Sequence, residues 1–330
     1  MRFHVVVGAG PTGTSTALLL AESGDRVRLV SRRGGGPAHP LIELVAADAT
    51  DAARLTELTE GATTLFNCAM PAYDRWPTDW PPLAGALLTA AERTGAGYVM
   101  LGNVYGYGPI AGSMTPDLPM APTTRKGRVR ATMWLDALAA HDAGRVRVTE
   151  VRASDYLGAG SASLYSLAVA PRVVAGEAAA YPGDHDAPTS WTYTGDVARV
   201  LVAASRDERA WGRAWHVPST SEASARELTV RLADVAGAPA PQLARMSAEE
   251  VAAAGRANSI MAEISEMLYL FEQPLILDAS LTEQTFGIGP TPLDDALIET
   301  VKGMSPSAQW RPGPPARGDI RSRPDALAAE

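Results

Sequence analysis

The chain has 330 residues, 46% of them hydrophobic, and a net charge of −8 at pH 7, so it can bury one large core or two unequal ones and offers no broad basic surface for nucleic acid. No apolar run reaches the ~20 residues that a membrane span needs, and the first residues resemble a strand rather than a signal peptide, so we expect a cytoplasmic protein without a membrane partner. The single cysteine, Cys68, excludes an internal disulfide, and the scattered histidines argue against a metal site.

A glycine-rich turn joins the first predicted strand to the first predicted helix. Residues 2–8 are an apolar, strand-like run, and residues 12–23 have the apolar spacing of a helix. Between them Gly8, Gly10 and Gly13 form the pattern Gly-x-Gly-x-x-Gly. A Cβ in such a turn would keep the backbone away from a pyrophosphate, and the helix N-terminus offers free N–H groups to that anion.

This turn predicts a bound dinucleotide, because a second strand, residues 26–31, completes the strand–turn–helix–strand unit. The residues expected to hold the pyrophosphate are Gly8, Gly10, Pro11, Thr12 and Gly13. The alternative interpretation is a glycine-rich connection that binds nothing.

The end of the second strand indicates which dinucleotide is preferred. An acidic residue there would accept hydrogen bonds from the adenine ribose 2′-hydroxyl of NAD(H). This chain has Ser31, Arg32 and Arg33 instead, and two guanidinium groups beside a hydroxyl suit a 2′-phosphate. The sequence therefore favours NADP(H), unless the arginines merely face solvent on the loop that continues into three glycines.

Strands and helices alternate through the first half of the chain, which predicts an α/β fold with a doubly wound parallel sheet. The further strands are expected at 41–46, 63–68, 97–102 and 146–152, and the helices between them at 51–59, 81–94 and 124–143. Most of these strands are continuously apolar, as strands buried on both faces are. Asp48 follows the third strand, at the carboxyl edge of the sheet where an adenine would lie.

The second half is less regular. Helical patterns are expected at 161–176, 195–205, 224–237, 247–272 and 292–302, with a loop at 187–193 leading into a strand and a short strand at 275–277. The end of the chain is rich in proline and arginine, and we expect residues 303–330 to form an irregular or disordered tail.

Five segments in a fixed order connect the chain to a known family; they lie at 65–69, 104–109, 151–158, 192–198 and 286–292. With them the chain resembles the extended short-chain dehydrogenase/reductase superfamily, in its NAD-dependent epimerase/dehydratase group. The resemblance implies a Rossmann-type dinucleotide-binding domain with a smaller C-terminal substrate lobe. The implied boundaries are 1–153 with 190–217 for the first and 154–189 with 218–302 for the second. It also implies that Asn67 and Ala69 lie near the nicotinamide ribose.

The chain departs from this family at the catalytic positions. The family uses a Ser or Thr, a Tyr that exchanges a proton with the substrate oxygen, and a Lys four residues after the Tyr. No Tyr-x-x-x-Lys occurs in this sequence. By position, Asn103 stands at the place of the serine, Lys126 at that of the tyrosine and Arg130 at that of the lysine.

These replacements retain some chemistry. Asn103 can hydrogen-bond a carbonyl or hydroxyl, and Arg130 can bind a ribose or phosphate. Lys126 acts as a general acid or base if desolvation lowers its pKa, or else it is a solvated residue at the start of a helix. Tyr105 and Tyr107 can supply a phenol from the same loop, although a packing role is the simpler interpretation of Tyr107.

Aromatic residues follow the strand ends where the substrate would lie. Tyr73 and Trp76 come after the fourth strand, and Ser154, Asp155 and Tyr156 come after the sixth. His185 and Trp191 flank a loop that approaches the substrate in the superfamily, although an exposed loop histidine is the more common interpretation of a residue such as His185. The pocket is therefore expected to be partly apolar, while the basic residues near 125–130 would suit an anionic substrate.

Two functions follow from these patterns. The first is an NADP(H)-dependent oxidoreductase, epimerase or dehydratase acting on a small carbonyl or alcohol, with Asn103 orienting the substrate oxygen and Lys126 or a tyrosine handling the proton. The second is a non-catalytic NADP(H)-binding sensor or scaffold that has lost the chemistry. A homodimer through the helices at 81–94 and 124–143 is also compatible with the sequence.

Overall fold

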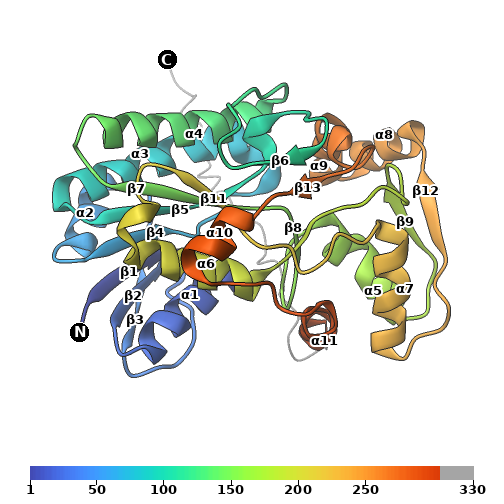
Figure 1. Cartoon of the computed structure of the whole chain (residues 1–330), viewed down its shortest axis with the longest axis horizontal. Coiled ribbons are helices and arrows are strands. Elements are labelled where there is room, and N and C mark those ends of the chain that lie inside the picture. The colour runs from blue at the N-terminus through green and yellow to red at the C-terminus, as the bar shows by residue number, and fades with distance from the viewer. Residues whose placement is uncertain (305–330) are drawn as a thin grey trace, which may run out of the picture.

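A seven-stranded parallel sheet forms the centre of the computed structural model, which describes residues 1–304. The strand order is β11-β7-β5-β4-β1-β2-β3 (Figure 1). The strands are β1 (Phe3–Val7), β2 (Arg26–Ser31), β3 (Ile42–Ala46), β4 (Thr64–Asn67), β5 (Gly97–Asn103), β7 (Val148–Ala153) and β11 (Ala214–His216). This confirms the predicted α/β class and the doubly wound, Rossmann-type sheet.

Helices cover both faces of this sheet, because its central strands carry apolar side chains on each side. One face packs against α2 (Ala52–Thr59), α3 (Trp76–Thr94) and α4 (Arg125–Asp142). The other packs against α1 (Pro11–Glu22) and α6 (Thr194–Arg206), as Figure 1 shows. Burial on two faces is the reason that the strands read as near-continuous apolar runs.

Helix α3 begins five residues before the predicted start at residue 81. Its first residue, Trp76, is fully buried, and Trp80 one turn later lies beside it in the core. Pro77 lies in the first turn, where a missing N–H costs nothing, but Pro81 and Pro82 lie inside the helix. The prediction was wrong because it placed the helix start at the proline pair, whereas the buried indole rings hold the earlier turn in helical form.

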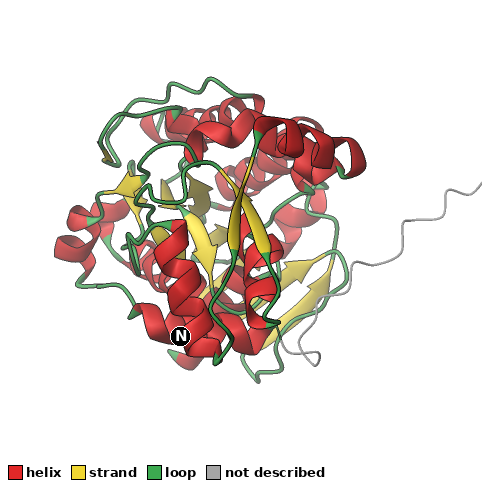
Figure 2. Ribbon diagram, turned by 90° about the vertical axis from the view of Figure 1, so that its right-hand side faces the viewer, coloured by secondary structure: helices red, strands yellow, loops and turns green. Residues whose placement is uncertain are grey.

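The remaining elements form a smaller C-terminal lobe and its connections to the sheet. Figure 2 views the molecule from the side of this lobe, where helices and loops predominate and the strands are short. Its elements are β6 (Ser113–Met114), β8 (Asp155–Leu157), α5 (Ala170–Val174), β9 (Ala179–Pro182), β10 (Trp191–Tyr193), α7 (Ala225–Ala236), β12 (Leu243–Met246), α8 (Ala248–Ala257), α9 (Ser259–Ile264), β13 (Ile276–Leu277), α10 (Ser280–Phe286) and α11 (Leu293–Gly303).

Several of these short elements differ from the sequence-based expectation. The helix predicted at 161–176 consists of a π-helical turn at Tyr165–Val169 followed by the five-residue α5. The strands β6, β8, β9, β11 and β12 and the helix α10 were not predicted at all. Strands of two to four residues have no usable periodicity, and each is stabilised by a partner far away in the sequence.

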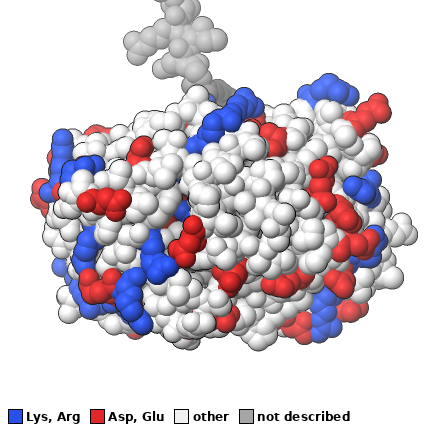
Figure 3. All heavy atoms as spheres, turned by 45° about the horizontal axis from the view of Figure 1, so that its top comes forward, with Lys and Arg blue, Asp and Glu red and all other residues white. Residues whose placement is uncertain are grey.

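The surface and the end of the chain complete the description. Figure 3 shows basic and acidic side chains interspersed around one face, with a broad uncharged area between them. Within residues 1–304, none of the helices combines the length and apolar character required to cross a bilayer. The tail predicted to be irregular lies, from residue 305 onward, outside the described residues.

Candidate active site

The candidate site lies where the order of the strands reverses. Strand β1 pairs with β2 on one side and with β4 on the other, so the connection after β1 runs toward one edge of the sheet and the connection after β4 runs toward the other. At such a point the connections after neighbouring strands diverge and leave room for a ligand beyond the carboxyl ends. The loops that follow β1, β4, β5 and β7 therefore define the site.

The glycine turn after β1 has the steric properties of a dinucleotide cradle. A Cβ on Gly8, which has φ of +107°, would lie 2.6 Å from the amide nitrogen of Ala69, and a Cβ on Gly13 would overlap the carbonyl oxygen of Gly8. A Cβ on Gly10 would meet no protein atom within 4 Å. Two glycines are thus required by the fold itself, whereas the third borders open space, as expected where a pyrophosphate approaches the backbone.

The first turn of α1 is available to an anion. Its N-cap is Gly10, which contributes no side-chain hydrogen bond, and no acidic side chain lies in the first turn. Pro11 is exposed at the first helical position, and Thr12 is buried behind it. The unpaired N–H groups and the positive end of the helix dipole therefore face the turn, and the residues present fit a dinucleotide pyrophosphate.

The residues expected at the adenosine end lie together at the edge of the site. Arg32 and Arg33 are exposed just after β2 and make no ion pair or side-chain hydrogen bond with any described residue. The Ser31 hydroxyl donates to the carbonyl of Gly35 over 3.5 Å. Asp48 is exposed, and hydrogen bonds from Thr50, followed by the charge of Arg32, lower the pKa of its carboxyl.

The residues at the end of β4 are held by the protein itself. Asn67 is fully buried, donates to the hydroxyl of Tyr98 over 3.3 Å and accepts from the amide of Ala69 over 3.3 Å. Cys68 is also buried, and burial raises the pKa of its thiol to about 12. The asparagine side chain thus shapes the loop beside the glycine turn, while Ala69 remains partly exposed there.

Asn103 lies at the end of β5, in register with Ala153 at the end of β7. Its side-chain oxygen accepts from the backbone amide of Tyr105 over 3.2 Å. Its amide nitrogen has no hydrogen-bond partner among residues 1–304, and the side chain is partly exposed. Asn103 can therefore donate to a substrate oxygen from a fixed position.

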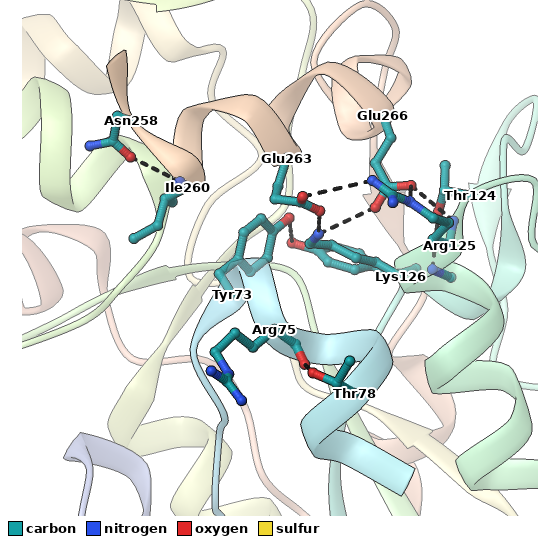
Figure 4. A network of polar contacts seen from close by, with 12 residues as sticks. Tyr73, Arg75, Thr78, Thr124, Arg125, Lys126, Asn258, Ile260, Glu263 and Glu266 are labelled. Atoms are coloured by element: carbon teal, nitrogen blue, oxygen red, sulfur yellow. Dashed lines mark hydrogen bonds and ion pairs between the residues drawn. The ribbon is translucent and has the colours of Figure 1, made fainter. Parts of the chain in front are cut away.

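Lys126 is fully buried and ion-paired, so the interpretation as a solvated residue is wrong. Its ammonium group bonds to the carboxylate of Glu263 on α9 and, over 3.3 Å, to that of Glu266 in the helical turn after it (Figure 4). The same nitrogen lies 4.5 Å from the centre of the Tyr73 ring. The side chain at the family's tyrosine position thus links α4 to the C-terminal lobe.

Arg130, one turn further along α4, is buried against two indole rings that are nearly perpendicular to each other. Its guanidinium carbon lies 4.6 Å from the ring centre of Trp76 and 4.5 Å from that of Trp80. One of its nitrogens donates to the carbonyl of Leu101 over 3.3 Å, but Nε has no partner among the described residues. Burial, opposed by the charge of Glu150, lowers the pKa of this arginine.

Tyr107 is buried in a separate polar network, away from Lys126. Its hydroxyl contacts Nε2 of His216 over 2.7 Å and accepts from Arg152 over 2.5 Å. Arg152 in turn donates to Glu150 over 2.6 Å. Burial, and next the charge of Arg152, lower the pKa of His216 to about 4, so the ring is neutral at pH 7. These contacts give Tyr107 the packing role that was the simpler interpretation.

Tyr73 and Tyr105 are brought together at the ends of β4 and β5. The hydroxyl of Tyr73 donates to that of Tyr105 over 3.4 Å, and both side chains are partly exposed. Trp76, by contrast, is 1% exposed and packs against Tyr105 and Trp80. The expectation that Trp76 walls an open pocket is therefore corrected: its ring lies in the core, against Tyr105.

The other residues expected to contact a substrate are divided between the site and the core. Tyr156 is partly exposed, whereas Ser154 is buried and its hydroxyl has no partner among the described residues. His185 is 4% exposed and its Nε2 contacts the carbonyl of Tyr181 over 2.9 Å, so it is not an exposed loop histidine. Trp191 is fully buried and donates to the carbonyl of Ala223, as a core residue does.

Asp155, which the sequence places between Ser154 and Tyr156 at the end of the sixth strand, is a titratable residue of the site to which the sequence analysis gave no role. It lies on β8, two residues beyond the end of β7, and is partly exposed. Burial raises the pKa of its carboxyl to about 6, against a weaker lowering effect of the Tyr181 hydroxyl, which donates to it over 3.4 Å. Its place directly after a strand at the carboxyl edge was the only sequence signal for it.

Comparison with known proteins agrees with this geometry. The model of the "NAD dependent epimerase/dehydratase family" matches residues 4–217. No curated protein sequence matches the chain.

Solved structures share its fold at low sequence identity. The Bordetella bronchiseptica enzyme WbmH, in complex with NAD⁺, has a TM-score of 0.74 and 20% identity, covering 94% of this chain and 100% of its own. The UDP-glucuronic acid 4-epimerase of Bacillus cereus, in complex with NAD, has a TM-score of 0.75 and 15% identity, covering 93% and 100%. A double mutant of the dTDP-glucose 4,6-dehydratase DesIV of Streptomyces venezuelae has a TM-score of 0.71 and 22% identity, covering 92% and 96%. On the family match over residues 4–217, the chain belongs to the NAD dependent epimerase/dehydratase family.

Proposed function

We propose that the protein is an NADP(H)-dependent oxidoreductase of the epimerase/dehydratase type that acts on a small carbonyl or alcohol. The observation that carries this proposal is the glycine turn at the point where the strand order reverses. There Gly10 borders open space and the uncapped first turn of α1 faces it. NAD complexes of the solved structures with the same fold support a nicotinamide dinucleotide as the cofactor.

The cofactor would supply hydride transfer at its nicotinamide ring. In this chain the turn from Gly8 to Gly13 would bind the pyrophosphate, and Arg32 with Arg33 would bind the 2′-phosphate. The free amide nitrogen of Asn103 would hydrogen-bond the substrate oxygen.

The proton would come from the tyrosine pair. Because the hydroxyl of Tyr73 donates to that of Tyr105, the hydrogen of the Tyr105 hydroxyl is available to a substrate oxygen. Burial, and next the charge of Asp155, raise the pKa of Tyr105, so this phenol is a neutral donor at pH 7. Lys126 would position Tyr73 rather than exchange a proton itself, since two carboxylates engage its ammonium group.

Titration of the protein with NADPH and with NADH tests the cofactor assignment. Replacing Arg32 and Arg33 by Gln removes two cations that have no other partner in the described structure. We expect the affinity for NADPH to fall by about tenfold or more while the affinity for NADH stays within about twofold. The exposed Arg93 offers a matched control, because R93Q removes one positive charge far from the turn. Equal affinities for the two dinucleotides in the unsubstituted protein would contradict the preference for NADP(H).

One observation favours a second function, a non-catalytic NADP(H)-binding sensor. The residue at the family's tyrosine position is committed to two carboxylates, so the usual proton exchange is absent there. If the protein binds NADPH tightly and Y105F, N103A and unsubstituted protein all fail equally to oxidise it with a panel of aldehydes and ketones, the sensor function is preferred.

A further inference from the structure

Two buried cations lie one turn apart on α4, and only one of them has counter-ions. The ammonium group of Lys126 is engaged by the carboxylates of Glu263 and Glu266, as Figure 4 shows. Arg130 is 6% exposed and forms no ion pair with any residue from 1 to 304. Burying a charge without a counter-ion costs free energy, so an anionic ligand at Arg130 would stabilise this arrangement.

The acidic side chains at this edge of the sheet have other partners. Glu150 is buried on β7 and accepts a hydrogen bond from Arg152 over 2.6 Å. Asp155 accepts its one side-chain hydrogen bond from the hydroxyl of Tyr181. Neither carboxylate pairs with Arg130, so the described part of the chain leaves this guanidinium group uncompensated.

The unused nitrogens of Arg130 form the edge of the guanidinium group that binds carboxylates. Nη1 donates to the carbonyl of Leu101 over 3.3 Å. Among the described residues neither Nε nor Nη2 has a hydrogen-bond partner, and Nη2, unlike Nε, is not sealed from solvent. In Arg75 the same two nitrogens donate to both oxygens of Asp79, over 2.9 Å and 3.0 Å. The free edge therefore has the planar fork that matches a carboxylate.

This guanidinium group lies at the carboxyl edge of the sheet, on the same strand end as Asn103. Its partner Leu101 directly follows Met100, the last residue of β5 that pairs with β4. Asn103 lies two residues further along β5, about 7 Å away in an extended strand. Its amide nitrogen has no partner within residues 1–304. Free donors of two side chains are therefore available at the end of β5.

Aromatic rings hold the guanidinium group in place before any ligand binds. Its central carbon lies 4.6 Å from the ring centre of Trp76 and 4.5 Å from that of Trp80. The ring of Tyr105 lies 5.8 Å from that of Trp76, so the same aromatic cluster reaches the tyrosine pair of the site. A side chain that is already fixed loses little conformational entropy when it binds a ligand.

We infer that Arg130 binds a carboxylate of the substrate through its free edge, while Asn103 donates to the neighbouring carbonyl or hydroxyl oxygen. This inference rests on the proposed function and narrows its substrate class to small hydroxy acids and oxo acids. Both donors act at the end of one strand, so the carboxylate and the reacting oxygen are separated by only a few bonds. Lys126 does not compete for this carboxylate, because two glutamates already engage it.

Three pairs of probes separate charge from shape: lactate and lactamide, 3-hydroxybutanoate and 3-hydroxybutanamide, and mandelate and mandelamide. Each probe is titrated into the NADPH-saturated full chain at about pH 7, where the acids are ionised, and its binding is measured by saturation-transfer NMR. The reduced cofactor accepts no hydride from a hydroxy acid, so binding is measured without turnover. We expect at least one carboxylate to bind about tenfold more tightly than its amide. Equal affinities within all pairs, or no binding of any carboxylate, would refute the inference.

Four variants assign the preference to Arg130. R130M should lower the affinity for the carboxylate by about tenfold and leave that for the amide within about twofold. R130K keeps the charge without the fork and should lose less. N103A should weaken acid and amide alike, because Asn103 contacts the oxygen that they share. R93M is the matched control, since Arg93 is an exposed arginine in the last turn of α3. A preference that persists in R130M contradicts the assignment.

The affinity for NADPH, measured on every variant, separates this inference from the proposed function. No binding of NADPH to the unsubstituted protein would refute the proposed function, and this inference with it. If R130M weakens the binding of NADPH while the preference for the carboxylate persists, Arg130 serves the cofactor and the inference alone is refuted. If R130M does not fold, R130K decides: it should bind the carboxylate several-fold more weakly than the unsubstituted protein does, and an undiminished preference in R130K would refute the inference.

Discussion

The ionisation of the Asp155 carboxyl should affect the stability of the folded chain. Folding raises the pKa of its carboxyl from 3.8 to about 6, so the native state holds this proton more tightly than the unfolded state does. The free energy of unfolding consequently falls as the pH rises from about 4 to about 6 and stays at the lower value above that range. We expect D155N to stabilise the protein by about 3 kcal/mol at pH 8, because one pKa unit corresponds to about 1.4 kcal/mol.

Urea denaturation at several pH values measures this effect. The gain from D155N should shrink as the pH falls from about 6 to 4, since both forms of residue 155 are then neutral in the native state. A gain that does not vary with pH would point to a packing effect instead.

The sequence predicted the role of some single residues and not of others, and the difference depends on whether the contacts of each residue are local in the sequence. The glycines were identifiable because their constraint is local: the backbone of the turn leaves no room for a Cβ at Gly8 or Gly13. The environment of Lys126 was not identifiable, because Glu263 and Glu266 lie more than 130 residues away in the sequence. The burial of Trp191 was not predictable for the same reason: the sequence around an aromatic residue does not indicate whether its ring contacts a ligand or the core.

Helix α1 and the turn before it offer a matched pair of substitutions. G10A places a methyl group in space that no protein atom occupies, so the melting temperature should change by no more than about 2 °C. The affinity for NADPH should nevertheless fall by about tenfold or more, because the methyl group stands between the backbone and the pyrophosphate. Differential scanning fluorimetry and fluorescence titration of the same samples measure both quantities.

G13A is the counterpart within the same helix. Its Cβ would overlap the carbonyl oxygen of Gly8, so the turn has to move and the melting temperature should fall markedly even without a dinucleotide. If G10A and G13A lower stability equally, the turn is a packing element alone and the dinucleotide assignment loses its main support.

The elements of the sheet were largely predictable, whereas those of the small lobe were not. The central strands β1, β4 and β5 are buried and largely apolar, and helices separate the strands along the chain, so pattern alone located them. Strand β8 has three residues, and its partner β10 lies more than 30 residues away. Such a strand forms because two loops that are distant in the sequence meet in the fold, and a local sequence pattern carries no information about that contact.

The two parts of the molecule are joined through a buried charge cluster. Lys126 at the start of α4 meets Glu263 and Glu266 from the C-terminal lobe, and the exposed Arg125 lies 3.7 Å and 3.8 Å from the same two carboxylates. A buried ammonium group is costly to leave without its counter-ions, so removing both carboxylates affects more than the local contacts. We therefore expect the position of the lobe relative to α4 to depend on Lys126, Glu263 and Glu266.

The double variant E263Q/E266Q tests this dependence. It leaves the ammonium group of Lys126 buried without an anionic partner, and we expect the free energy of unfolding in urea to fall by about 3 kcal/mol. The triple variant K126M/E263Q/E266Q removes all three charges and should recover most of that loss, because a well-packed apolar side chain is tolerated where an unpaired charge is not. If the double variant is as stable as the unsubstituted protein, the cluster does not hold the lobe. If the triple variant is no better than the double, the loss comes from the glutamate side chains themselves rather than from the stranded charge.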